Sequence, residues 1–89
     1  MLEVICFTGK DCKPCEALKP VLKEVTDAYK VKLTTFDRDQ YRELASSYGI
    51  YSVPNTLFLS KNKVITSRVG FITKKDIANI LDEIISKEK

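Results

Sequence analysis

Hydrophobic and polar positions in the first third of the chain follow two different periods. Residues 2–8 are rich in Val, Ile, Phe and Thr, which favour extended structure, so they predict a largely buried strand. Residues 9–11, Gly-Lys-Asp, end that run. Between residues 13 and 29, apolar side chains recur three or four positions apart, which is typical of an amphipathic helix. We expect a kink at Pro20, because proline has no N–H to donate. The periodic positions are Leu18, Val21, Leu22, Val25 and Tyr29.

A second strand and a short helix are predicted next. Residues 31–36 contain β-branched and aromatic residues and predict a strand. A short helix follows, and we expect it to start near the aspartates of residues 37–39. Gly49 is expected to end it, since glycine readily adopts the left-handed conformation found after a helix. The apolar positions of this helix are Tyr41, Leu44, Ala45 and Tyr48.

The last third of the chain predicts a β-hairpin and a final helix. Residues 53–60 and 63–69 predict two strands joined by a tight polar turn. The final helix is expected to begin at Thr73, which together with Asp76 fits a capping box. Its predicted buried stripe consists of Ile77, Ile80, Leu81, Ile84 and Ile85.

The element order β-α-β-α-β-β-α predicts an α/β fold. One β-α-β unit supplies two parallel strands through a right-handed crossover, and the hairpin adds antiparallel strands. We therefore expect a four-stranded mixed sheet with three helices, in a single domain that spans residues 1–89. With 44% hydrophobic and 30% charged residues, the composition is that of a globular chain and excludes a disordered one.

Charge and cysteine content narrow the possible functions. The net charge is only +3 and the lysines are interspersed with acids, so we expect a solvated surface and no nucleic-acid partner. No basic segment precedes a long apolar stretch, so neither a secretory signal nor a membrane span is predicted. Three cysteines are a poor basis for a secreted disulfide framework, which favours a cytoplasmic location. A chain of this size has no need to associate, and we expect a monomer.

Two of the cysteines, Cys12 and Cys15, lie where the first strand passes into the first helix. Backbone N–H groups at a helix N-terminus stabilise a thiolate, which is the nucleophilic form of cysteine. The spacing allows a second thiol to attack a mixed disulfide and release the product. We expect Cys12, ahead of the first turn, to attack and Cys15 to resolve. Lys13 adds a favourable positive charge, and Pro14 restricts the loop.

Two other interpretations of this cysteine pair are weaker. A structural zinc site needs four ligands, and the chain has no histidine and only one further thiol, Cys6. Asp11 or Glu16 would have to complete such a site. A pair of inert cysteines does not explain their position at a helix start. A metal carrier that uses Cys12 and Cys15, and a binding module without turnover, remain hypotheses from other functional classes.

The chain resembles the thioredoxins over nearly its whole length, from about Glu3 to Ile85. The resemblance rests on Cys-Lys-Pro-Cys at residues 12–15 with Pro20, on Val53-Pro54, and on Val69-Gly70 before the last helix. The chain has the length of the shortened members, which lack the first strand and helix. The resemblance implies the thioredoxin fold, with Pro54 as a cis-proline that faces the cysteine pair.

The resemblance also implies how the protein works. Substrates would be proteins with disulfides, bound as an extended segment along the Val53 backbone and past Gly70. No cofactor or metal is expected, because the two thiols carry the electrons. A separate reductase, expected to be a flavoprotein, would recycle the pair. Glutathione is the alternative recycling partner, because Ser52-Val53-Pro54 is similar to the glutathione-binding segment of glutaredoxins.

Two departures from the thioredoxin pattern stand out. The chain has no tryptophan, and Thr8 and Asp11 occupy the places of the family's tryptophans near the motif. Cys6 occupies the place of a buried aspartate that is thought to help move the resolving thiol's proton. A thiol does this poorly, since burial raises its pKa above about 8.5, so we interpret Cys6 as a small core residue.

Overall fold

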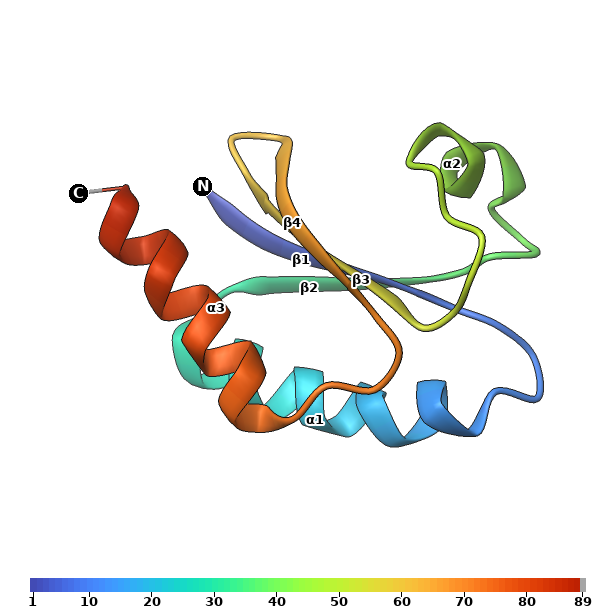
Figure 1. The fold of residues 1–89 in the computed structure, drawn as a ribbon, viewed down its shortest axis with the longest axis horizontal. Helices are drawn as coiled ribbons and strands as arrows, with labels where there is room; N and C mark the ends of the chain where they lie inside the picture. Colours follow the sequence, from blue (N-terminus) through green and yellow to red (C-terminus); the bar gives the residue numbers. More distant parts are fainter. Residues whose placement is uncertain (89) are drawn as a thin grey trace.

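The computed structural model describes residues 1–88 and contains one four-stranded sheet with three helices (Figure 1). The element order confirms the α/β prediction. The elements are β1 (Leu2–Thr8), α1 (Lys13–Tyr29), β2 (Lys32–Asp37), α2 (Arg42–Ser47), β3 (Asn55–Ser60), β4 (Lys63–Val69) and α3 (Lys74–Lys87).

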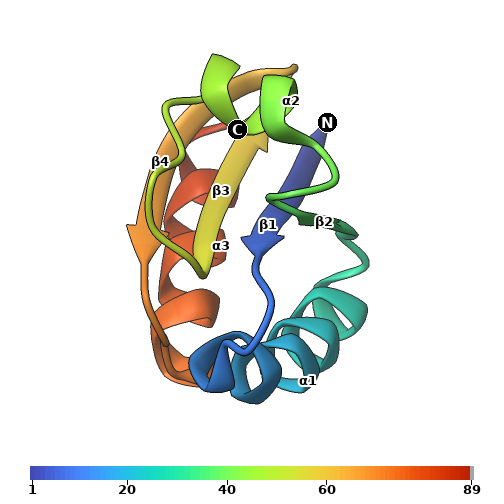
Figure 2. The ribbon, with the colours of Figure 1, turned by 90° about the vertical axis from the view of Figure 1, so that its right-hand side faces the viewer.

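The order of the strands in the sheet is β2-β1-β3-β4. β1 runs parallel to β2 and antiparallel to β3, and β4 is antiparallel to β3. In the register of these pairs, Thr8 lies opposite Asp37, and Phe7 lies opposite Asn55. The segments that follow β1 and β2 and the segment that precedes β3 therefore meet at one edge of the sheet, where Figure 2 shows the end of β1.

Two element boundaries differ from the sequence prediction for local reasons. β3 begins at Asn55 and not at Val53, because Pro54 has no N–H to contribute to a ladder. α2 begins at Arg42, later than predicted, because the Asp37 carboxylate accepts the backbone N–H groups of Asp39 and Gln40 and forms a turn there (2.8 and 3.3 Å).

The predicted helix and hairpin ends are otherwise confirmed. Gly49 follows α2 with φ +70°, in the left-handed region. Residues 61 and 62 form the hairpin turn, and both have positive φ, as the favoured two-residue turns require. α1 continues through Pro20 as one helix, and the kink that we expect there stays a prediction.

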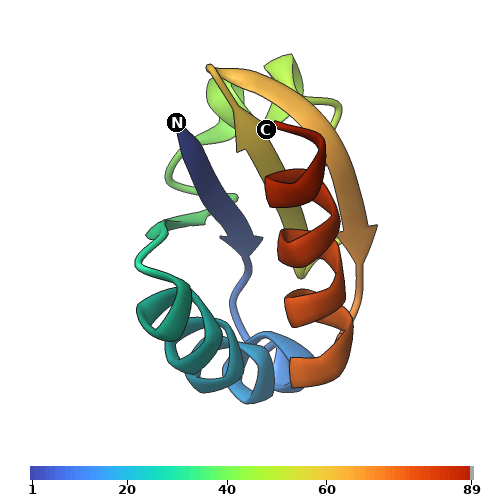
Figure 3. The ribbon, with the colours of Figure 1, turned by 90° about the vertical axis from the view of Figure 1, so that its left-hand side faces the viewer.

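The core has two halves, one on each face of the sheet. α1 and α3 lie side by side on one face, where their apolar stripes contact Val4 and Phe58 (Figure 3). α2 lies on the opposite face and packs through Ala45 against Phe7 and Leu57. The predicted α3 stripe is buried except at Ile85, which is half-buried. None of the helices in residues 1–88 combines the length and apolarity needed to span a bilayer.

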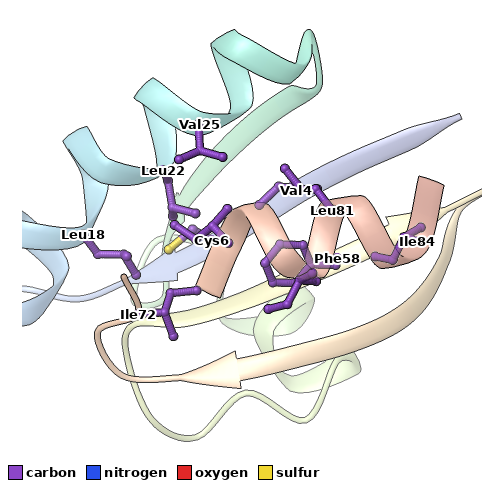
Figure 4. Packing of buried hydrophobic residues seen from close by; sticks show 11 residues of the cluster. Val4, Cys6, Leu18, Leu22, Val25, Phe58, Ile72, Leu81 and Ile84 are labelled. Atoms are coloured by element: carbon purple, nitrogen blue, oxygen red, sulfur yellow. The ribbon is translucent and has the colours of Figure 1, made fainter. Parts of the chain in front are cut away.

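Cys6 belongs to the core half beneath α1 and α3. Its side chain is 1% exposed, and Figure 4 shows it among Leu18, Leu22 and Ile72. The Thr56 hydroxyl donates to its Sγ at 3.7 Å. Burial raises the pKa of the Cys6 thiol, and the hydrogen bond from Thr56 opposes this only in part. Cys6 is therefore a neutral core thiol.

α3 begins with the predicted capping box. The Thr73 hydroxyl accepts the N–H of Asp76 at 3.1 Å, and the Asp76 carboxylate accepts the N–H of Thr73 at 3.3 Å. These two bonds satisfy backbone donors that have no partner within the helix. They fix where α3 starts, and α3 covers one half of the core together with α1.

Replacing Thr73 with alanine should therefore destabilise the fold. We expect Thr73→Ala to lower the free energy of unfolding by about 1 kcal/mol, a typical value for a lost cap. Urea denaturation of the oxidised protein measures this. The matched control is Lys75→Ala, an exposed position in the same turn, which should change stability by less than about 0.5 kcal/mol. Equal effects of the two substitutions would contradict the role of the cap.

The buried Cys6 thiol predicts a loss of stability in alkaline solution. Its pKa is raised from 9.0, so the unfolded chain releases this proton first, and the free energy of unfolding falls as pH rises through that value. In Cys6→Ala this part of the slope should vanish. Urea denaturation of both oxidised proteins from about pH 8 to about pH 10 tests it.

That pH range separates the titration of Cys6 from that of Tyr29. The pKa of Tyr29 is also raised, from 10.0, because its hydroxyl donates to the Asp82 carboxylate, so it acts mainly above the window and equally in both proteins. Parallel stability curves for the two proteins would show that Cys6 does not titrate differently on unfolding.

Candidate active site

Cys12 and Cys15 form a disulfide at the N-terminus of α1, with their Cα atoms 5.2 Å apart. Cys12 is the N-cap residue and has extended backbone angles (φ −108°, ψ 96°). The N–H of Cys15 points to the Sγ atom of Cys12 at 3.2 Å, and the N–H of Glu16 donates to the carbonyl of Cys12 at 3.1 Å. The sulfur of Cys12 therefore occupies the position in which a serine or aspartate oxygen usually caps a helix.

The two cysteines differ in accessibility. Cys12 is half-buried, whereas Cys15, inside the first turn, is 2% exposed. Lys13 and Pro14 between them are exposed, and Pro14 lies in the first turn, where its missing N–H costs no hydrogen bond. A disulfide partner in solution can reach only the sulfur of Cys12 without movement of the helix.

The environment of Cys12 favours a thiolate once the disulfide is reduced. The N–H groups of the first helical turn have no partners within the helix, and the helix dipole places positive charge there. The Cys15 N–H is already aligned with the Cys12 sulfur, so the anion gains a hydrogen bond without rearrangement. A thiolate stabilised in this way attacks disulfides at neutral pH.

The Val53-Pro54 segment lies at the same edge of the sheet as the cysteine pair. Its peptide bond is cis, as expected, and Pro54 is buried. The carbonyl of Pro54 accepts the N–H of Gly70 at 2.8 Å, which connects this segment to the loop before α3. Within residues 1–88, the backbone N–H and C=O of Val53 make no hydrogen bond. They are available to an extended chain.

Gly70 lies in the loop between β4 and α3, next to the Val53-Pro54 segment. Gly70 has φ +88°, and a side chain built on it would meet no atom within 4 Å, so the space beside it is open. Tyr51 and Phe71 are exposed apolar side chains from the two loops, and Val69 is an exposed apolar side chain at the end of β4. Tyr51 is 84% exposed. Their exposure is typical of a surface that binds another molecule.

Two residues that sequence reasoning missed hold these loops together. A Cβ atom on Gly9 would lie 2.9 Å from Cγ2 of Val53, so only glycine permits this approach of the two loops. The Arg38 guanidinium donates from Nη1 to the carbonyl of Tyr51 at 3.3 Å. Arg38 directly follows β2, and the sequence signal that could have found it is that position at the carboxyl edge of a parallel pair.

The donor set does not suggest a metal centre. Among residues 1–88, no three His, Cys, Asp or Glu side chains lie close enough to hold a metal ion. Cys6 lies in the core, where its Sγ accepts a hydrogen bond from the Thr56 hydroxyl. The arrangement of the site is that of a dithiol that exchanges with disulfides.

Comparisons with known proteins agree with this chemistry. The family model described as Thioredoxin matches residues 2–83. The thioredoxin of Bacillus subtilis is 35% identical over 83 residues, which cover 91% of this chain and 76% of the relative. The thioredoxin of Mycoplasmoides gallisepticum is 34% identical over 79 residues, which cover 88% of this chain and 79% of the relative.

Solved structures show the same fold. A mutant thioredoxin from Halobacterium salinarum superimposes with a TM-score of 0.88 at 22% identity, and the match covers 92% of this chain and 73% of that one. The germline-specific thioredoxin Deadhead from Drosophila gives a TM-score of 0.83 at 25% identity, with 92% and 79% coverage. With its disulfide at the start of α1 and its cis-proline at the same edge, the chain belongs to the thioredoxin family and is a thiol–disulfide oxidoreductase.

Proposed function

We propose that the protein reduces disulfides in other proteins, with Cys12 as the attacking and Cys15 as the resolving residue. The observation that carries this assignment is the N–H of Cys15 directed at the sulfur of Cys12. The half-buried Cys12 is the more accessible of the two, and the helix N-terminus stabilises its Sγ as an anion, whereas the buried Cys15 is protected from competing partners.

The reaction then proceeds in two exchanges. The Cys12 thiolate attacks one sulfur of the substrate disulfide, an intermolecular disulfide forms, and the other substrate sulfur leaves and takes up a proton. Cys15 loses its proton to water and attacks the Cys12 sulfur, which releases the second substrate thiol. Two electrons pass to the substrate, and Cys12 and Cys15 end as the disulfide seen in the structure.

The substrate segment binds along Val53 in this proposal. The unpaired N–H and C=O of Val53 offer two hydrogen bonds to an extended chain, in the manner of an added strand. Gly70 leaves room for the backbone of that chain, and Val69 and Phe71 offer apolar contacts. The attacked disulfide is thereby held over Cys12, because both loops end at the same edge of the sheet.

Recycling requires a donor of two electrons, and we propose a flavoprotein reductase in preference to glutathione. The Lys-Pro pair between the cysteines is closer to the thioredoxin pattern than to the glutaredoxin one, and the family comparison supports thioredoxin. The two thiols need no bound cofactor. We further propose that the protein acts as a monomer in the cytoplasm, since an odd number of cysteines suits a reducing compartment.

Single cysteine variants separate the proposed roles. Cys12→Ser should abolish the reduction of insulin disulfides, because the nucleophile is lost. Cys15→Ser should stop after the first exchange and accumulate a mixed disulfide with the substrate, visible by mass spectrometry. Cys6→Ser is the control and should keep most of the activity. Turnover that survives in Cys12→Ser, or a mixed disulfide on Cys6, would contradict the assignment.

A side chain at Gly70 should impair protein substrates selectively. The space beside Gly70 is open in the free protein, so the Cβ of Gly70→Ala contacts no protein atom and meets an incoming substrate. Alanine is strained at the φ of +88°, and a small disulfide as the second substrate separates this backbone effect from the loss of docking. We expect kcat/KM for insulin to fall by about tenfold, as for the loss of roughly 1.4 kcal/mol of binding. The rate with a small aromatic disulfide, which does not extend along Val53, should change by less than about twofold. Equal losses with both substrates would show a general effect on the site and contradict the docking proposal.

A further inference from the structure

Arg38 lies where three segments around the cysteine pair meet. Its backbone N–H donates to the carbonyl of Thr8, the last residue of β1, at 2.8 Å. Its Nη1 donates to the carbonyl of Tyr51, two residues before Val53, at 3.3 Å. The side chain is 36% exposed, so the guanidinium is anchored on one side and open to solvent on the other.

The second terminal nitrogen of Arg38, Nη2, lies near Val53, along which we propose that substrates bind. The point where a Gly9 Cβ would stand is 3.8 Å from Nη2 of Arg38 and 2.9 Å from Cγ2 of Val53. Nη2 therefore borders the contact between Gly9 and Val53. Among residues 1–88 no acceptor is bonded to Nη2, since the guanidinium uses Nη1 for Tyr51 and only Nε approaches Asp39.

Two carboxylates flank Arg38 in the sequence, and neither accepts a hydrogen bond from its guanidinium: the Asp37 carboxylate accepts the backbone N–H groups of Asp39 and Gln40. The Asp39 carboxylate is 3.8 Å from Nε, which is long for an ion pair and leaves Nη2 uncovered. Near the cysteines, exposed Lys10 and Lys13 stand against exposed Asp11 and Glu16, so that group is balanced overall. This balanced group gives no net attraction for charged substrates. Any preference for an acidic substrate would therefore come from the N–H donors of the Arg38 guanidinium.

We propose that Arg38 selects disulfide substrates that carry a carboxylate next to the attacked cysteine. A segment that pairs with the Val53 backbone passes Nη2, and a planar guanidinium matches a carboxylate better than any neutral acceptor. The substrate class is thus a protein disulfide with Asp or Glu beside one cysteine. This inference rests on the docking along Val53 in the proposed function.

Two peptides, each cyclised by one disulfide and differing only by Glu or Gln beside a cysteine, test the inference. The pre-reduced protein is mixed with each peptide in a single turnover, so no recycling partner is needed. Each rate constant is divided by that for dithiothreitol with the same peptide, which removes the intrinsic effect of the nearby charge on the disulfide. We expect a corrected preference for Glu of roughly three- to fivefold, lost at high salt.

Variants assign the preference to Arg38. Arg38→Lys keeps the charge and should keep part of the preference, whereas Arg38→Gln should bring the ratio of the two rates to about one. Lys61→Met, in the hairpin turn at the opposite edge of the sheet, is the control and should leave the ratio unchanged. A loosened Tyr51 contact would slow both peptides alike, so the ratio separates recognition from structural damage.

The results distinguish the role of Arg38 in substrate selection from the proposed reduction of protein disulfides. Equal corrected rates for the unmodified protein, or a preference that survives in Arg38→Gln, would overturn the role of Arg38 while leaving the proposed function intact. Failure to reduce either peptide would overturn the proposed function and this inference with it. Should Arg38→Gln not fold, the salt dependence of the unmodified protein and the Arg38→Lys ratio decide.

Discussion

The Sγ atom of Cys12 serves as the N-cap of α1, and the site's chemistry depends on this one arrangement. The first N–H groups of a helix need acceptors, and here one acceptor is the sulfur that we propose as the nucleophile. The same bond that starts α1 therefore lowers the cost of charge on the sulfur. The arrangement also accounts for the different exposure of the two cysteines. Cys12 stands before the first turn, whereas Cys15 lies within that turn and is buried.

The sheet order explains why a second loop lies at the same end of the sheet as this sulfur. β1 lies between β2 and β3, so the ends of three strands meet beside the start of α1. Gly9 permits close contact with Val53, and Arg38 spans from the end of β1 to Tyr51. The edge that we propose for docking is thus formed by backbone and by one long side chain. Thr8 and Asp11 stand where the thioredoxins that the chain resembles have tryptophans near the motif. Tyr51 and Phe71 add exposed apolar side chains in the loops at this end of the sheet.

The sequence predicted most elements and the reactive pair because their signals are local. Periodicity identified α1 and α3, the Thr73 and Asp76 pattern located the start of α3, and Gly49 marked the end of α2. The starts of β3 and α2 were misplaced, since they depend on the missing N–H of Pro54 and on a side-chain turn at Asp37. The roles of Gly9 and Arg38 were missed, because their contacts join segments that only the strand order brings together.

The central claim is that the α1 N-terminus acidifies Cys12, and a titration of that single thiol tests it most directly. The double variant Cys6→Ala, Cys15→Ser leaves Cys12 as the only cysteine and preserves the N–H at residue 15. The ultraviolet absorbance of the thiolate, followed against pH, gives the pKa of Cys12. The account predicts a value at least about one unit below the 8.5 of an unperturbed cysteine. A value at or above 8.5 would contradict it.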